Sequence, residues 1–288
     1  MRVAKWDDYK VIATGDGYKL ERWKDVVLLR PDPQVIWKSQ IDMNGYNGLS
    51  AKYIRSETGG GRWLVKGKMP DEWTISYKDL KFKIKPMGFK HTGLFPEQAV
   101  NWDLMTDLIK SAGREINVLN LFAYTGGATV ACAKAGAKVC HVDAAKGMVE
   151  RAGENVRLSN VGDGKVRYII DDCKKFVERE IRRGRRYDAI IMDPPSYGRG
   201  PNGEMWKLEN ELYYFVELCS QVLSDNPLFV LINSYTTGLQ PQVLKNILSL
   251  TVAKDGKGNV EAYEVGLETA ENGVVLPCGN SGIWINGK

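Results

Sequence analysis

The chain has 288 residues, of which 43% are hydrophobic and 26% charged, and these ordinary globular values exclude a largely disordered chain. No apolar run approaches the ~18–20 residues that cross a bilayer, and the first ten residues lack the apolar core of a signal peptide, so we expect a cytoplasmic protein without membrane contact. Five cysteines without C-x-x-C spacing and only two histidines argue for reduced thiols and against a metal site.

The net charge of +5 is concentrated near the N-terminus. Residues 1–90 hold 18 Lys and Arg against 11 Asp and Glu, a net +7, whereas residues 91–288 carry a net −2. The same basic segment holds five of the eight tryptophans. Basic side chains interleaved with aromatic rings suit a nucleic acid, whose phosphates and bases they bind. The alternative is that these rings form the core of a small basic β-domain.

The first part of the chain predicts short strands and turns. Residues 62–77 have strand-like composition with a Pro-Asp turn signal. Residues 79–85 alternate apolar side chains with lysine at period two, which is typical of a half-buried strand. A connector containing glycine follows Lys85 and Pro86. We therefore predict a small basic β-rich domain over 1–87, a candidate for RNA binding, and a second domain over 88–288.

From about residue 98 the pattern alternates between helices and strands. Helices are expected over 98–112, 127–135, 146–158, 174–183, 209–223 and from about 240. Strands are expected over 117–122, 138–143, 166–171, 187–193 and 228–234, with two closing strands over 260–267 and 282–286. This alternation with short loops predicts an α/β fold with a doubly wound, mostly parallel, seven-stranded sheet. Ligands bind such sheets beyond the carboxyl ends of the strands.

The ends of the first two strands predict a site for adenosine. Gly126 and Gly127 follow the first strand and let the backbone approach a ligand closely. Asp143 ends the second strand, where a carboxylate accepts hydrogen bonds from both hydroxyls of a ribose. The alternative for Asp143 is to cap the next helix. An adenosine site of this kind fits either NAD or S-adenosylmethionine.

Two further strand ends carry aspartates. At the end of the third strand, the Asp172 carboxylate can accept a hydrogen bond from the adenine amine, with the Cys173 backbone N–H beside it; capping of the next helix is the alternative. Asp193, Pro194, Pro195, Ser196 and Tyr197 end the fourth strand. The two prolines make a rigid loop that aims the aspartate at a planar amine, and the aromatic ring can stack on a base. A simple structural turn is the alternative. Residues 198–203 then form a candidate lid.

These motifs resemble those of the class I S-adenosylmethionine-dependent methyltransferases. Within that class, residues 120–127, 142–143, 172–173 and 193–196 are similar to motifs of the bacterial 23S ribosomal RNA methyltransferases that modify cytosine C5 or guanine N7. Residues 90–98 are similar to the K-x-T-G-(aromatic)-x-x-D-Q stretch of that group. The resemblance covers about residues 85–288. It implies a Rossmann-like methyltransferase with S-adenosylmethionine as cofactor, RNA as substrate and a role in rRNA processing.

The resemblance also implies roles for the matched residues. The residues implied to bind the cofactor are Phe95, Gln98, Phe122, Tyr124, Thr125, Gly126, Gly127, Asp143, Ala144, Asp172, Cys173 and Asp193. The catalytic residues, implied to lie between the cofactor and the substrate base, are Asp193, Pro194, Ser196 and Tyr197. One departure is Tyr124, which stands where many methyltransferases have the first glycine of the turn.

The choice of acceptor atom depends on a cysteine. Methylation of cytosine at C5 needs a thiolate that adds to C6, and in the cytosine-C5 enzymes that cysteine follows the fifth strand. Here Ser234 stands at that place. Cys278, between the two expected closing strands, is the remaining candidate nucleophile. Methylation of a base nitrogen needs only positioning, an acceptor for the N–H and exclusion of water.

We therefore predict an S-adenosylmethionine-dependent methyltransferase that methylates a base of ribosomal or other RNA, with nitrogen favoured as the acceptor. The alternatives are a cytosine-C5 RNA methyltransferase that uses Cys278, a protein or small-molecule methyltransferase, and a non-catalytic RNA-binding protein. A nicotinamide-dependent oxidoreductase is disfavoured because the chain lacks a G-x-G-x-x-G turn after the first strand.

Overall fold

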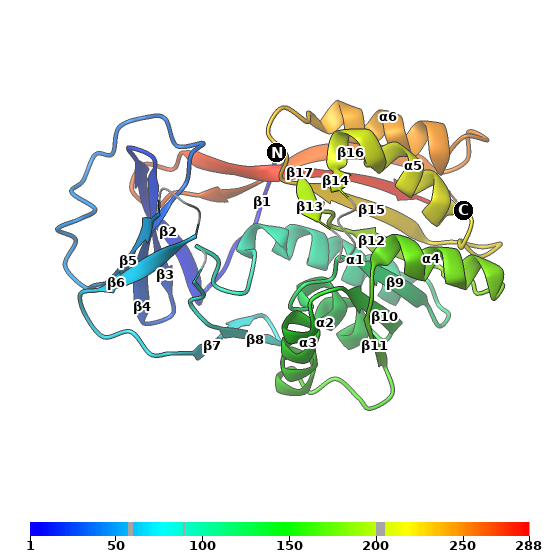
Figure 1. Ribbon diagram of the computed structural model, residues 1–288, viewed down its shortest axis with the longest axis horizontal. Coiled ribbons are helices and arrows are strands. Elements are labelled where there is room, and N and C mark those ends of the chain that lie inside the picture. Colours follow the sequence, from blue (N-terminus) through cyan, green and yellow to red (C-terminus); the bar gives the residue numbers. More distant parts are fainter. Residues whose placement is uncertain (57–59, 89, 200–204, 288) are drawn as a thin grey trace. The chain divides into compact units, whose positions relative to one another are not determined.

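The computed structural model describes residues 1–56, 60–88, 90–199 and 205–287, and its chain forms two compact units (Figure 1). The smaller unit contains residues 2–100 and 266–278, and the larger contains 101–265 and 279–288 together with Met1. Residues 88–100 and 266–278, which the sequence analysis assigns to the second domain, thus cluster with the smaller unit. The domain boundary after residue 87 stays a prediction. Residues 200–203 of the expected lid over 198–203 lie outside the described residues.

A five-stranded sheet forms most of the smaller unit. Its strands follow the order of the chain and are β2 (Tyr9–Gly15), β3 (Tyr18–Trp23), β4 (Val26–Pro31), β5 (Leu49–Arg55) and β6 (Gly61–Val65). Neighbours are antiparallel except β4 and β5, which are parallel. A separate antiparallel pair consists of β7 (Trp73–Tyr77) and β8 (Leu80–Ile84). In β8 the apolar residues are buried while Lys81 is exposed, which confirms the predicted alternation.

Most of an eight-stranded sheet lies in the larger unit, although residues 2–3, 266–268 and 275–278 of its strands cluster with the smaller unit. In spatial order the strands are β1 (Arg2–Val3), β16 (Asn259–Glu268), β17 (Val275–Ile285), β15 (Phe229–Ser234), β12 (Ala189–Met192), β9 (Asn117–Leu121), β10 (Lys138–Asp143) and β11 (Val166–Ile170). The pairings from β15 to β11 are parallel, and β17 is antiparallel to β15. The predicted doubly wound α/β sheet is confirmed, with the two-residue β1 as an eighth strand.

Helices cover both faces of this sheet. They are α1 (Ala99–Ser111), α2 (Gly127–Lys134), α3 (Lys146–Leu158), α4 (Cys173–Arg182), α5 (Leu208–Ser220) and α6 (Pro241–Thr251), with a 3-10 turn, η1 (Pro96–Gln98), before α1. Alternate residues of β9, such as Leu119 and Leu121, share a buried apolar cluster with α4, α5 and α6. Asn120 points to the opposite face and donates a hydrogen bond to Thr129 of α2 at 2.8 Å. Successive residues of β9 therefore face opposite sides of the sheet, with α4, α5 and α6 on one side and α2 on the other.

Two elements near the C-terminal end differ from the sequence analysis. The last strand, β17, begins at Val275 rather than near residue 282. Cys278 therefore lies inside a strand, and the expectation that it lies in a connection between two strands is wrong. The short strands β13 (Tyr197–Arg199) and β14 (Met205–Lys207), which were not expected, pair as an antiparallel hairpin. Among the described residues no helix is long and apolar enough to cross a membrane.

Candidate active site

The parallel strands of the larger sheet end at one edge, which we call the carboxyl edge. In the register of the sheet, Leu121 of β9 lies opposite Val142 of β10 and Met192 of β12, and Met192 lies opposite Ile232 of β15. The loops that follow these strands therefore start at the same level. All the predicted site residues of the larger unit follow or end one of these strands, so the topology brings them to one edge.

The turn after β9 has an unusual backbone. Phe122 (φ 53°), Tyr124 (φ 51°) and Gly126 (φ 82°) are all left-handed, a conformation that costs free energy for side chains larger than glycine. Neighbouring loops hold this turn in place. The Phe122 N–H donates to the Cys173 sulfur at 3.2 Å, and the Tyr124 N–H donates to Asp143 Oδ2 at 2.8 Å. The turn is thus fixed by residues at the end of β10 and at the start of α4.

The glycines of this turn lie against other helices. A Cβ on Gly126 would lie 2.9 Å from the Ala152 Cβ in α3, and a Cβ on Gly127 would lie 2.7 Å from the Trp102 ring in α1. Gly126 is the N-cap of α2, and Gly127 is its first residue. Both glycines are therefore required by close packing of helices, in addition to the left-handed backbone at Gly126. Thr125 between them and Tyr124 is buried, and its carbonyl accepts a hydrogen bond from Asn155 at 2.9 Å.

Asp143 is half-buried at the end of β10, and both of its oxygens bind backbone. Oδ2 accepts the Tyr124 N–H, and Oδ1 accepts the Ala145 N–H at 2.8 Å, across Ala144. The N-cap of α3 is Ala145 rather than Asp143, so the alternative of a helix cap is not what the structure shows. Each carboxylate oxygen accepts more than one hydrogen bond, so the same side chain retains capacity for ligand hydroxyls.

Asp172 and Cys173 begin α4. Asp172 is its N-cap, because Oδ1 accepts the Lys175 N–H at 2.9 Å, and this interaction does not use Oδ2. The neighbouring Asp171 pairs with Arg179, about two helical turns further along α4. Burial raises the pKa of the Cys173 thiol well above its ordinary value, so this cysteine is protonated. Its sulfur packs in the core and accepts the Phe122 N–H.

The loop after β12 carries the predicted catalytic residues. The Asp193 N–H donates to the Leu121 carbonyl at 3.4 Å, which continues the pairing of β12 with β9. Pro195 and Ser196 are tied to the following segment, because the Pro195 carbonyl accepts the Trp206 indole N–H at 2.6 Å and the Ser196 carbonyl accepts the Leu208 N–H at 3.1 Å. Pro194 is buried, Asp193 is half-buried and Tyr197 is 49% exposed. The loop therefore holds its backbone rigidly and leaves the Tyr197 ring accessible.

The Ser196 hydroxyl connects this loop to the end of β15. It accepts a hydrogen bond from the Thr236 hydroxyl at 2.7 Å. Thr236 in turn donates its backbone N–H to the Ser234 hydroxyl at 3.2 Å. Ser234, which stands where the cytosine-C5 enzymes carry cysteine, is buried and engaged in this chain of hydrogen bonds.

Trp206 is a residue of the carboxyl edge that the sequence analysis missed. Its ring centroid lies 5.6 Å from those of Phe122 and Phe215, which lie 5.6 Å from each other. The cluster joins the turn after β9 to the loop after β12. Trp206 lies in a hairpin strand too short to leave a periodic pattern, so the only sequence signal was its position between the Asp193 loop and a helix with an aromatic face.

Phe95 and Gln98 belong to the smaller unit and lie at η1. The Gln98 N–H donates to the Phe95 carbonyl at 3.1 Å, and Gln98 is buried. The Phe95 ring lies 5.6 Å from that of His91. Burial and the charges of Arg30, Lys90 and Lys19 lower the pKa of His91 to about 4, so its imidazole is neutral near pH 7.

Comparison with known protein families identifies the cofactor for which this chain is built. The sequence profile of the S-adenosylmethionine-dependent methyltransferase family matches residues 46–232. The chain belongs to this family. Its cofactor is accordingly S-adenosylmethionine, and the alternative of NAD, which the two glycines and Asp143 left open, is set aside.

Similar proteins support the same assignment. A crystal structure of an S-adenosylmethionine-dependent methyltransferase from Agrobacterium tumefaciens is 32% identical, with a TM-score of 0.91 over 98% of this chain and 91% of that chain. The ribosomal RNA large subunit methyltransferase K/L of Methylococcus capsulatus is 28% identical over 66% of this chain and 24% of its own length. The ribosomal RNA large subunit methyltransferase K of Neisseria meningitidis is 27% identical over 64% and 53%, respectively. The chain spans about half or less of the length of these curated relatives.

Proposed function

We propose that the chain methylates a base of RNA, with ribosomal RNA as the first substrate to test and a base nitrogen as the acceptor. Two observations support the substrate class: curated relatives are named ribosomal RNA large subunit methyltransferases, and the first 90 residues carry a net charge of +7. The observation that carries the proposal is the loop at residues 193–197, where a half-buried carboxylate and an accessible aromatic ring stand on a backbone fixed by two prolines.

Several residues of the carboxyl edge suit the cofactor. In the proposed arrangement, Asp143 accepts the ribose hydroxyls, Asp172 accepts the adenine amine through Oδ2, and the turn from Phe122 to Gly127 contacts the methionine end. The cofactor contacts implied for Phe95 and Gln98, which belong to the smaller unit, stay predictions. Bound S-adenosylmethionine supplies a methyl group on a sulfonium, with S-adenosylhomocysteine as the leaving group.

Asp193 has the central role in the proposed chemistry. Its carboxylate accepts an N–H of the base amine and holds the nitrogen lone pair toward the methyl carbon. The N–C bond forms as the S–C bond breaks, and the proton released by the nitrogen passes to the carboxylate. Pro194 and Pro195 restrict the backbone that follows Asp193 and so fix the position from which its carboxylate extends. The Tyr197 ring stacks on the base.

The state of the cysteines favours nitrogen over carbon as the acceptor. Carbon-5 methylation needs a thiolate, and burial raises the pKa of the Cys278 thiol well above its ordinary value. The Cys278 sulfur contacts the Leu276 carbonyl at 3.5 Å. Cys132, Cys140, Cys173 and Cys219 are buried, and burial raises the pKa of each thiol. None of these groups is a ready nucleophile near pH 7.

Methyl transfer from labelled S-adenosylmethionine to unmodified ribosomal RNA tests the proposal, with mass spectrometry of the nucleosides to identify the product. We expect an N-methylated nucleoside. Asp193→Ala should lower kcat about 100-fold, because it removes the acceptor that positions the amine. Asp163→Ala, which changes an exposed aspartate in the loop before β11, is the matched control and should retain activity.

Other outcomes would replace the proposal with one of its alternatives. A 5-methylcytidine product that Cys278→Ala abolishes would establish the carbon mechanism. Binding of S-adenosylhomocysteine without label in any RNA would indicate a protein or small-molecule substrate. Binding of RNA without binding of S-adenosylhomocysteine would indicate a non-catalytic RNA-binding protein.

A further inference from the structure

The segment that links the sheet of the smaller unit to η1 is held by side chains of that same unit. Four side-chain donors bind its backbone carbonyl oxygens, in the pairs Trp6–Pro96 at 2.9 Å, Arg30–Lys90 at 2.8 Å, Tyr53–Gly88 at 3.0 Å and Trp63–Met87 at 2.9 Å. These hydrogen bonds hold the backbone of Lys90 in one position, so the Cα from which its side chain extends is fixed.

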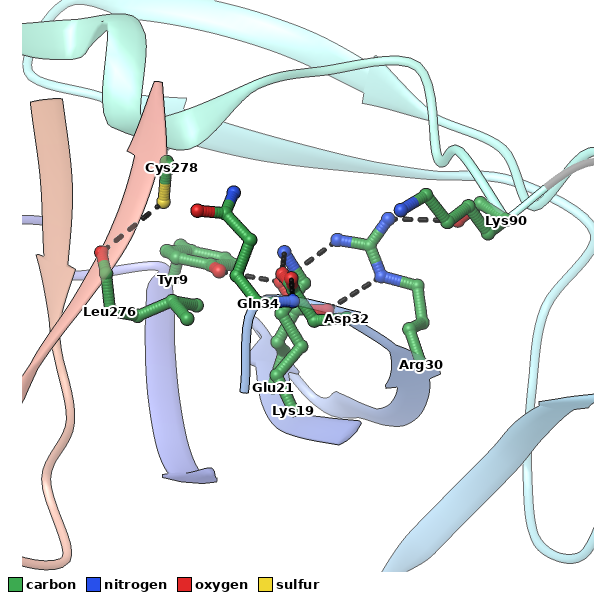
Figure 2. Close-up of polar contacts among 9 residues, drawn as sticks. All are labelled: Tyr9, Lys19, Glu21, Arg30, Asp32, Gln34, Lys90, Leu276 and Cys278. Carbon is green, nitrogen blue, oxygen red and sulfur yellow. Dashed lines mark hydrogen bonds and ion pairs between the residues drawn. The ribbon is translucent and has the colours of Figure 1, made fainter. Parts of the chain in front are cut away.

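The charges beside Lys90 are already balanced against one another. Arg30 forms two hydrogen bonds to Glu21, from Nε at 2.6 Å and from the second terminal nitrogen at 2.8 Å. Tyr9 donates to Glu21 at 2.6 Å, and Lys19 lies 3.3 Å from Asp32. Figure 2 shows this network, with the Lys90 side chain turned toward the Arg30 guanidinium. Glu21 is thus paired with Arg30, and Asp32 with Lys19.

Lys90 itself is a half-buried cation in a positive environment. The described residues place no acidic side chain within ion-pair distance of Lys90 or of Arg55. Burial lowers the pKa of the Lys90 ammonium, and the charges of Lys19, Arg30 and Arg55 lower it further, against the opposing effect of Asp32. A cation in such a place is stabilised by an anion brought from outside. Arg55 lies at the exposed end of β5, two residues after Tyr53, whose hydroxyl binds the Gly88 carbonyl two residues before Lys90. Arg55 therefore adds a second positive charge that can bind another phosphate of the same RNA strand.

We propose that Lys90 and Arg55 bind phosphate groups of the RNA substrate, an inference that rests on the proposed function. A polyanion supplies successive charges to both cations, and lysine and arginine are the usual partners of backbone phosphates. The contact would be independent of sequence and would position RNA rather than select a base.

The salt dependence of RNA binding tests this inference. Binding of a short fluorescein-labelled single-stranded RNA is measured by anisotropy across a salt series for the parent, Lys90→Gln and Arg55→Gln. Each lost phosphate contact should make the slope of log K against log salt shallower by about 0.7. The matched control is Lys83→Gln, which also removes one positive charge from the smaller unit but whose ammonium pairs with Glu72 at 3.0 Å. Its slope should equal that of the parent.

Two further measurements separate the possible failures. The affinity for S-adenosylhomocysteine should be unchanged in Lys90→Gln and Arg55→Gln, which also shows that both variants fold. If the parent methylates RNA but both variants keep its salt slope, the inference is overturned while the proposed function stands. Weaker RNA binding with an unchanged slope would likewise overturn it, since the lost contact would not be to phosphate. If the parent neither binds nor methylates RNA, the proposed function itself fails.

Discussion

Phe122 and Tyr124, in the turn at the carboxyl edge, have a left-handed backbone that is strained for residues with a Cβ. A left-handed backbone costs roughly 1–2 kcal/mol for a residue with a Cβ. The cost is offset by the hydrogen bonds that Cys173 and Asp143 accept from these two residues. Strain of this kind persists where the surrounding structure determines the conformation, and here it shapes the turn that we assign to the cofactor.

Gly126→Ala should show how tightly this turn is packed. The substitution places a Cβ 2.9 Å from that of Ala152 on a left-handed backbone, so it combines strain with overpacking. We expect a loss of about 2–4 kcal/mol in the free energy of unfolding. Gly164→Ala is the matched control, because Gly164 has a similar φ of +73° and open space around its Cβ position. Urea unfolding of both variants checks this, and equal losses would contradict the packing argument.

His141 predicts a pH dependence of stability. It is fully buried, with Nδ1 2.9 Å from the Thr129 hydroxyl, and burial lowers its pKa to about 4. Since its pKa is higher in the unfolded chain, about 6.5, the stabilisation is complete above that value and is lost as the pH falls toward 4, by roughly 3 kcal/mol. Urea unfolding between about pH 7 and pH 4 should therefore show a shallower dependence for His141→Gln than for the parent. Parallel curves would rule out this assignment.

At the scale of elements, the tryptophans near the N-terminus serve the smaller unit itself. Trp23 is fully buried, and the Trp37 indole donates to the Thr14 hydroxyl at 3.1 Å. Trp6 and Trp63 donate to the carbonyls of Pro96 and Met87. The interpretation of these rings as a packed core therefore describes these four residues better than stacking on RNA bases, and the basic side chains remain the candidates for nucleic-acid contact.

Helix α4 offers a test of two roles for one side chain. Asp172 caps the helix and is also our candidate acceptor for the adenine amine. Asp172→Ser should retain the cap, because serine is a comparable N-cap, but its short side chain should weaken binding of S-adenosylhomocysteine about 10-fold. Asp172→Ala should weaken binding equally and also cost about 1 kcal/mol of stability. Calorimetric titration and urea unfolding check this. Unchanged affinity for S-adenosylhomocysteine in both variants would show that Asp172 caps the helix and does not bind the cofactor.

At the scale of the whole molecule, the cofactor should stabilise the fold by mass action. A ligand at about 100 times its Kd adds roughly 2.7 kcal/mol to the free energy of unfolding. We expect S-adenosylhomocysteine to raise the melting temperature and NAD to leave it unchanged. Differential scanning calorimetry with each ligand checks this, with Gly126→Ala as a variant that should respond less. A shift with NAD alone would contradict the assigned cofactor.

The sequence by itself determined the order of elements in the larger unit and the residues at its carboxyl edge. Strands and helices such as 138–143 and 146–158 agree with the structure because hydrophobic periodicity is a local property of the chain. The parallel topology then follows, and it brings Asp143, Asp172 and Asp193 to one edge without further information.

Only the tertiary structure decided features that depend on residues distant in the chain. The sequence could not choose between a cap and a ligand contact for Asp172, and the structure shows the cap. It did not reveal Trp206, whose contacts with Phe122 and Pro195 join separate loops. Nor did it place Arg30 on the Lys90 carbonyl, 60 residues away. Such contacts arise from three-dimensional packing of side chains, which leaves no periodic trace in the sequence.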